Sequence, residues 1–244
     1  MSEVGPADAL WVLAAAFAGY DVVPDVLGRR HPRALRRGPA ASGLVALSFD
    51  DGPHPEITPA VLDHLAAAGA RATFFVVGEN VRRHPDLVRR MLREGHAVGV
   101  HTTTHRHAWI TSPARLRWEL TQGMAAITEA TGLRPLWFRP PWGAFNAVTW
   151  TTANRLGLRV ALWSCDAGDW LPGASPAAIR RRVLAGVEPG GVIDLHDGGQ
   201  TPRGCWAMAE ILPDVLAAAR SRGLQPAHLG ELTGLPAMGE AHGP

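Results

Sequence analysis

The stretch LVALSFDDGPHPEITPAVLDHLAAAGARATFFVV (residues 44–77) contains one complete strand–helix–strand unit. Residues 44–49 and 72–77 form apolar runs, and residues 56–69 between them place apolar side chains at helical spacing. Apolar runs without alternation are typical of strands buried on both faces, as in a parallel sheet covered by helices. This stretch therefore predicts an α/β fold.

The same alternation of strand and helix continues along the chain. Further apolar runs occupy 97–100, 135–138, 159–163, 192–195 and, more weakly, 224–229, and helical periodicity occupies 81–95, 113–131, 146–157, 175–187 and 205–222. Six or seven such units favour a closed or nearly closed barrel, with a doubly wound open sheet as the alternative. We expect residues 44–244 to form this domain, preceded by an N-terminal apolar helix and an Arg-rich linker over residues 1–43.

Composition limits the class of protein. A chain of 244 residues with 46% apolar residues is long enough for one large buried core, which excludes a disordered chain. The balance of 24 basic against 22 acidic residues argues against a nucleic-acid-binding protein. Two cysteines, Cys165 and Cys205, are too few for a disulfide scaffold, and they either pair with each other or remain free.

An apolar run of 12 residues fills positions 9–20, and arginines cluster over residues 29–37. The run alone is too short for a bilayer core of about 30 Å. Acidic Glu3 and Asp8 precede it, whereas a secretory signal carries positive charge there, so no cleavable signal is predicted. Two interpretations remain: a helix packed on the domain, or membrane-surface association through residues 9–37.

Polar side chains follow the predicted strands at their carboxyl ends. In chain order they are Asp50, Asp51, His101, His105, Arg139, Asp166, His196 and Asp197. In a parallel barrel these strand ends converge on one face, where active sites are found. We therefore expect these side chains to form one site.

Their chemistry suggests a metal site beside an acid–base pair. One Asp and the two imidazoles of HTTTH (101–105) would make a three-ligand site with open positions, with His107 as a plausible substitute ligand. Adjacent side chains at a strand end point in different directions, so one of Asp50 and Asp51 can bind metal while the other takes a proton from water. Arg139 can hold Asp50 ionised by hydrogen bonding, and Asp166 can favour the charged form of His196.

These residues lie in five segments: SFDDG (48–52), HTTTH (101–105), RPPWG (139–143), DAGDW (166–170) and VIDLHD (192–197). In this order they resemble the five motifs of the polysaccharide deacetylase family, the NodB-homology domain of carbohydrate esterase family 4. The resemblance covers residues 44–232. It implies a distorted (β/α)7 barrel and metal-dependent hydrolysis of an acetyl group, usually the N-acetyl group of an N-acetylglucosamine-type glycan such as peptidoglycan or chitin.

The resemblance also implies roles for individual residues. Asp50 is the general base, and Asp51, His101 and His105 bind a divalent metal, most often zinc, with Co, Ni or Mn as alternatives. The backbone N–H of Trp142, where the family commonly has Tyr, holds the oxyanion. His196 protonates the leaving amine, Arg139 orients Asp50, and Asp166 tunes His196. Trp163, Trp170 and Leu195 resemble the apolar residues of the family that line the site around the acetyl methyl group and the sugar ring.

Asp194 departs from the family, which usually has an aliphatic residue at this position. Because Asp194 shares a strand face with His196, we expect it to pair with an Arg or with metal-site water, or to have a raised pKa. An O-acetyl xylan-type esterase and a non-catalytic glycan-binding envelope protein are the alternative functions. Glycan substrates favour a cell-envelope or membrane-associated location, and the sequence leaves the oligomeric state open.

Overall fold

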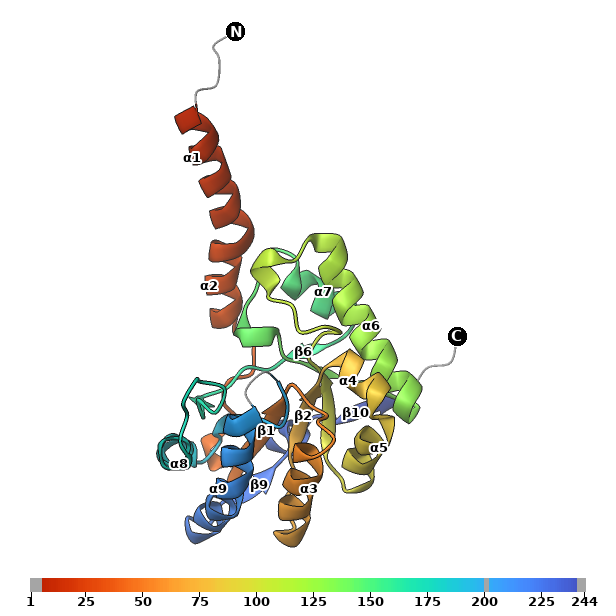
Figure 1. The fold of residues 1–244 in the computed structure, drawn as a ribbon, viewed down its shortest axis with the longest axis vertical. Helices are drawn as coiled ribbons and strands as arrows, with labels where there is room; N and C mark the ends of the chain where they lie inside the picture. Colours follow the sequence, from red (N-terminus) through yellow and green to blue (C-terminus); the bar gives the residue numbers. More distant parts are fainter. Residues whose placement is uncertain (1–5, 200–201, 241–244) are drawn as a thin grey trace.

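The computed structural model describes residues 6–199 and 202–240; residues 1–5, 200–201 and 241–244, which belong to the predicted N-terminal segment and catalytic domain, lie outside the described residues. A curled parallel sheet forms the body of the protein (Figure 1). Its strands are β1 (Leu44–Asp50), β2 (Thr73–Val76), β3 (Ala97–Val100), β5 (Trp137–Phe138), β6 (Arg159–Val160), β7 (Cys165–Asp166), β8 (Val192–His196) and β9 (Gln225–Ala227). Their order is β6-β5-β3-β2-β1-β8-β7, with β9 paired to the start of β1, so the predicted parallel sheet and distorted barrel are confirmed.

The sheet curls far enough for one chain segment to touch both of its edges. The backbone N–H of Ala161 donates to Phe138, at the β5 side, and that of Ser164 donates to Val192, at the β8 side, each at 2.9 Å. Only Leu162 and Trp163 lie between these two hydrogen bonds. Within the described residues no ladder joins β6 to β7. This crossing segment closes the gap together with residues 35–38, where Leu35 hydrogen-bonds to Val160 and Leu162 and Gly38 donates to Gly190.

Alternation along the strands sorts side chains between two faces of the sheet. On β1 the buried Val45, Leu47 and Phe49 pack in the core between sheet and helices. Ala46 instead belongs to a second apolar cluster inside the barrel, with Phe75, Trp137, Ala161, Val192, Leu229 and Leu232. Ser48 and Asp50 lie two and four residues after Ala46 on β1, so their side chains also face the barrel interior. They lie nearer the carboxyl end of the strand than this apolar cluster.

Helices surround the sheet. They are α3 (Ile57–Ala67), α4 (Gly78–Arg83), α5 (Pro85–Arg93), α6 (Pro113–Thr131), α7 (Thr149–Arg155), α8 (Pro176–Gly186), α9 (Pro202–Ser221) and the short α10 (Leu229–Thr233). The prediction of one helix over 81–95 is wrong, because α4 ends at Arg83 and, after His84, Pro85 begins a new helix. The short α10 was not predicted, and the other helices lie within a few residues of the predicted segments.

Two further features differ from the sequence expectations. A short antiparallel pair, β4 (Leu133–Pro135) and β10 (Met238–Glu240), was not predicted. The possible disulfide is absent, since Cys165 and Cys205 are both free thiols. The buried thiol of Cys205 donates to the carbonyl of Gly198 at 2.9 Å.

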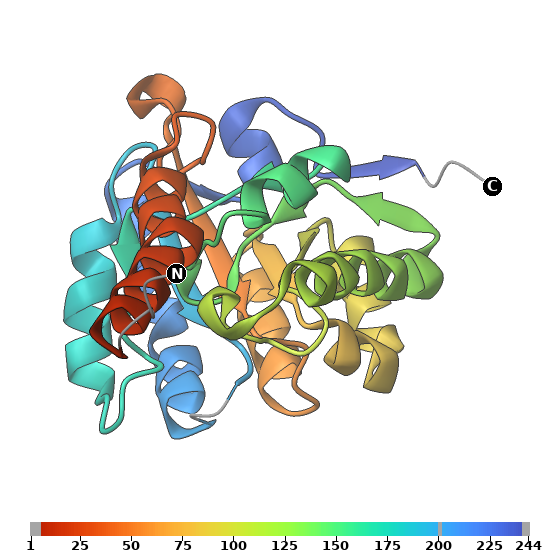
Figure 2. The ribbon, with the colours of Figure 1, turned by 90° about the horizontal axis from the view of Figure 1, so that it is seen from above.

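The N-terminal segment is one continuous helix made of α1 (Pro6–Phe17), a π-helical turn (Ala18–Val22) and α2 (Val23–Arg30). It rises from the barrel in Figure 1 and lies over one side of it in the view from above in Figure 2. The helix is longer than the 12-residue apolar run: by length and composition alone, its Leu10–Arg30 portion is sufficient to cross a membrane.

Candidate active site

Three predicted metal ligands converge at the carboxyl ends of β1 and β3. Oδ1 of Asp51 lies 3.0 Å from Nε2 of His105 and 3.3 Å from Nε2 of His101. The ligand atoms of these three residues all lie within 4.8 Å of one another. The alternative ligand His107 is not part of this group; its Nδ1 accepts a hydrogen bond from the backbone of Trp109 instead.

The chemistry of these atoms fits a cation. Nδ1 of His101 lies 2.8 Å from the carbonyl oxygen of Arg139, which can only accept, so Nδ1 carries a proton and Nε2 is the ring nitrogen that faces Asp51. Oδ1 of Asp51 is buried and has no hydrogen-bond donor among the described residues. Burial raises the pKa of Asp51, but the two imidazoles outweigh this effect and hold the pKa well below its usual range. One carboxylate oxygen and two imidazole nitrogens that lie this close together are the ligand types that a divalent cation such as zinc binds.

A buried carboxylate holds the loop that carries these ligands. Glu119 on α6 accepts hydrogen bonds from the backbone N–H groups of Thr103 and Thr104 at 2.9 and 2.8 Å. Among the described residues, the non-glycine residues with a left-handed backbone are Asp51, Thr102, His105 and Trp142. Such conformations are sparsely populated for L-residues, and here they gather at one site.

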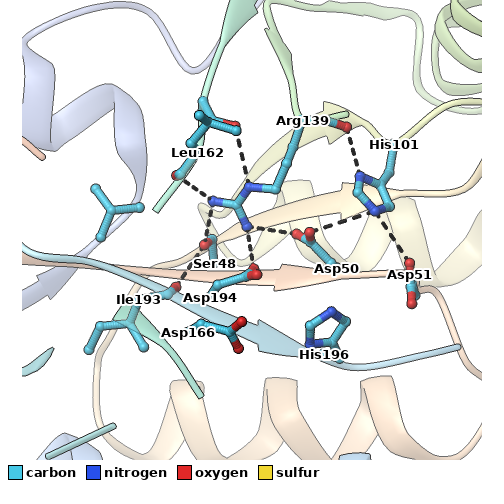
Figure 3. Close-up of polar contacts among 12 residues, drawn as sticks. Ser48, Asp50, Asp51, His101, Arg139, Leu162, Asp166, Ile193, Asp194 and His196 are labelled. Carbon is cyan, nitrogen blue, oxygen red and sulfur yellow. Dashed lines mark hydrogen bonds and ion pairs between the residues drawn. The ribbon is translucent and has the colours of Figure 1, made fainter. Parts of the chain in front are cut away.

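Arg139 is buried inside the barrel and bridges two carboxylates (Figure 3). Its Nη1 donates to Asp50 at 2.8 Å and to Asp194 at 2.6 Å. Its Nη2 donates to Ser48 at 2.9 Å and to the carbonyl of Leu162 at 3.0 Å. The predicted contact of Arg139 with Asp50 is present, and so is the predicted pairing of Asp194 with an Arg.

Asp194 also has a raised pKa. Burial is the main cause, and the nearby Asp50 carboxylate adds to it, while Arg139 acts in the opposite direction. One guanidinium carries a single charge for two carboxylates, and this favours the protonated form of Asp194.

His196 pairs with Asp169, and the prediction that Asp166 tunes it is wrong. Nδ1 of His196 lies 2.8 Å from Oδ1 of Asp169, and the backbone N–H of His196 donates to Oδ2 of the same carboxylate at 2.8 Å. Asp166 instead accepts from Nε1 of Trp170 at 3.1 Å. The loop after β7 turns back after Asp166, which brings Asp169 against the end of β8.

The environment of His196 favours its charged form. Burial lowers the pKa of His196, but the charge and hydrogen bond of Asp169, with smaller contributions from Asp194 and Asp50, raise it well above its ordinary value. His196 is therefore an imidazolium near neutral pH, as a general acid needs to be.

The group of predicted metal ligands and the group around Asp50 and His196 both line one cavity of about 310 Å³. Its lining includes Asp50 and Asp51, His101, His105 and His196, and Trp142, Trp163, Asp166, Trp170 and Asp194. The expectation that Leu195 lines it is wrong: strand alternation turns Leu195 toward the helices, where it is fully buried in the outer core. Trp142 and Trp170 are 46% and 40% exposed, so both offer ring faces to a ligand.

The N-terminal helix also contributes to this cavity, which the sequence did not indicate. Arg29 on α2 lines it, donates from Nη2 to the carbonyl of Trp142 at 3.1 Å, and pairs through Nε with Asp25 at 2.9 Å. Asp25 in turn accepts the backbone N–H of Phe145 at 2.7 Å. Asp25 and Arg29 thus clamp the two ends of the loop that carries Trp142.

A family model described as polysaccharide deacetylase matches residues 37–161, about half of the chain and three of the five motifs. The chain belongs to the polysaccharide deacetylase family. This confirms the resemblance that the motifs indicated. The α1–α2 helix lies outside the matched residues, and so do DAGDW and VIDLHD.

Other members of the polysaccharide deacetylase family are similar over most of this chain. A peptidoglycan-N-acetylglucosamine deacetylase of Bacillus cereus is 39% identical over 176 residues, which are 70% of this chain and 81% of that protein. One of Listeria monocytogenes is 35% identical over 190 residues, 78% of this chain but only 39% of its own length. The crystal structure of the Bc1960 peptidoglycan N-acetylglucosamine deacetylase, in complex with 4-naphthalen-1-yl-N-oxidanyl-benzamide, superposes with a TM-score of 0.79 at 28% identity and covers 84% of this chain and 94% of that chain.

Proposed function

We propose that this protein is a metal-dependent deacetylase that hydrolyses the N-acetyl group of N-acetylglucosamine-type glycans, such as peptidoglycan or chitin, and releases acetate. One observation carries the proposal: Asp50 and His196, a carboxylate and an imidazolium, face one cavity together with the group formed by Asp51, His101 and His105. Amide hydrolysis needs a base for water, an acid for the amine and a cation for the carbonyl oxygen. The names of the relatives support an N-acetylglucosamine substrate.

Asp51, His101 and His105 would hold the divalent metal. Imidazole and carboxylate ligands suit zinc, with Co, Ni or Mn as alternatives. When bound, such an ion polarises the acetyl carbonyl and lowers the pKa of water.

The chain's own groups then move the protons. Asp50, oriented by Arg139, takes a proton from the attacking water, whose oxygen bonds to the acetyl carbon. The backbone N–H of Trp142 donates to the oxyanion. His196, charged through Asp169, gives its proton to the nitrogen as the C–N bond breaks, and the products are acetate and a free amine.

The sugar is held by aromatic rings. Trp142 and Trp170 expose ring faces at the cavity mouth, and Trp163 lies deeper in the lining. Flat indole faces suit the apolar faces of sugar rings. We assign catalysis to residues 44–244, with residues 1–43 as an accessory segment that associates with the membrane surface through residues 9–37.

Acetate release from N-acetyl chitooligosaccharide and from peptidoglycan tests this proposal. The zinc-loaded protein should release acetate, and Asp50→Asn should abolish release with the metal still bound, because an amide cannot accept the proton of water. Release from acetylated xylan alone would favour the O-acetyl esterase. Binding of glycans without any release would favour the non-catalytic alternative, and either result would overturn the proposal.

A further inference from the structure

The upper part of the N-terminal helix presents apolar side chains to solvent. Leu10, Trp11, Val12 and Leu13 are between 66% and 76% exposed, and every residue from 10 to 17 is exposed. An exposed apolar helix costs free energy in water, so it needs an apolar partner. By length and composition, Leu10–Arg30 meets the requirement for a membrane-crossing helix.

The lower part of the helix is fixed to the catalytic face. The carbonyl of Tyr20 accepts the backbone N–H of Ala147 at 2.8 Å, next to the loop that Asp25 and Arg29 clamp. The ring of Phe17 packs edge-on against Trp109 at 5.6 Å between centroids. The free part of the helix therefore projects from the same end of the barrel on which the cavity opens (Figure 1).

Apolar side chains continue from the helix onto the rim of the cavity. Trp109 and Ile110 are 37% and 73% exposed, and the ring of His107 lies between Trp109 and Trp142, 5.5 and 5.0 Å from them. Away from the helix and this rim, the exposed large apolar side chains of the described residues are only the scattered Trp118, Trp206 and Leu235. Tryptophan is enriched where proteins meet the membrane–water interface.

The contacts also limit how deep the helix can go. Residues 6–16, above the packed Phe17, extend about 16 Å at 1.5 Å per residue, roughly half of a 30 Å hydrocarbon core. A full crossing would pull Asp21 and Asp25, both buried against the barrel, into hydrocarbon and would break the clamp on the Trp142 loop. With the helix docked, residues 6–16 reach only one leaflet.

We infer that the free part of α1 inserts into one leaflet, holds the cavity mouth against the lipid surface, and selects acetylated glycans that are carried by a lipid. The choice of glycan rests on the proposed function, while the lipid contact rests on the helix and rim alone. Because the cavity opens toward the inserted helix, a glycan attached to a lipid reaches it without leaving the membrane surface.

The lipid contact is tested by flotation of the full chain with vesicles of phosphatidylcholine and about 30% phosphatidylglycerol. The unmodified protein should float, Leu13→Glu should reduce the bound fraction at least about tenfold, and the matched control Leu235→Glu should not change it. Intact mass should show that the floated protein retains residues 6–30. Failure of the unmodified protein to float, equal flotation of Leu13→Glu, or burial of the helix in a dimer that does not float would overturn the inference.

The substrate preference is tested with one N-acetyl chitooligosaccharide in two forms, soluble and coupled to a dialkyl lipid in the same vesicles. The unmodified protein should deacetylate the lipid-linked form at least about tenfold faster, because both partners share the surface. Leu13→Glu should lose this advantage and keep the rate on the soluble form. Equal rates on both forms for a floating protein would overturn the lipid-linked class, whereas no acetate from either form would refute the proposed function and leave the flotation result standing.

Discussion

Replacing Asp169 with Asn tests the assignment of His196 as a charged general acid. Asp169 accepts two hydrogen bonds from His196, each at 2.8 Å, and is fully buried. A hydrogen bond to a charged group contributes about 1.5–3 kcal/mol, and 1.4 kcal/mol is a factor of ten, so the loss of the ionic bond should weaken protonation of His196 about 10- to 150-fold. The alkaline limb of the kcat profile for acetate release should then move to lower pH, with a smaller effect on KM.

Asp166→Asn is the matched control, because Asp166 lies in the same loop and lines the same cavity but hydrogen-bonds to Trp170. It should leave the alkaline limb in place. The raised pKa of His196 also makes a prediction for folding: its contribution to the free energy of unfolding is complete below about pH 6.5 and is lost as pH rises through the folded-state pKa. Asp169→Asn should diminish that loss in denaturant titrations. An unmoved alkaline limb in Asp169→Asn, or a moved one in Asp166→Asn, would refute the reasoning.

Four further predictions follow from the same contacts. Asp194→Asn should retain kcat/KM within about 0.5 kcal/mol, because a protonated carboxyl and an amide both accept from Arg139; a loss comparable to that of Asp50→Asn would show that Asp194 acts as a carboxylate. Chelation should abolish acetate release and zinc should restore it, while His105→Ala should weaken zinc affinity in a competition titration. Glu119→Gln should lower the free energy of unfolding by about 1–3 kcal/mol in urea titrations, because Glu119 is fully buried under the His101–His105 loop. Asp25→Ala leaves the buried N–H of Phe145 without its acceptor and should lower kcat more than it raises KM; an unchanged kcat would contradict the clamp.

The sequence predicted those site residues whose position in space follows from their place along a strand. Asp50, His101, Arg139 and His196 follow apolar strands, and the carboxyl ends of parallel strands meet at one face. Strand parity also predicted that Asp194 faces the interior. The same parity places Leu195 on the opposite face, so that error came from the family likeness and was avoidable.

Other features depend on the path of the chain between elements. DAGDW offers two carboxylates to His196, and only the turn after β7 selects Asp169 over Asp166. The contact between Arg29 and Trp142 spans 113 residues, and no local pattern announces it. Nothing in the spacing of Glu119 indicated that it holds the ligand loop. These contacts became evident only once the helices were packed.

The crossing segment between β6 and β7 changes how substitutions of Arg139 should be interpreted. Arg139 hydrogen-bonds to the carbonyls of Ala161 and Leu162 within that segment while it also holds Asp50. The buried Arg139 side chain thus both holds the segment between β6 and β7 and orients the general base Asp50. Loss of activity in an Arg139 variant would therefore have two causes, a weakened contact with the crossing segment and a misoriented Asp50 carboxylate. The role of the base is better tested by substituting Asp50, and the role of the crossing segment by substituting Leu162.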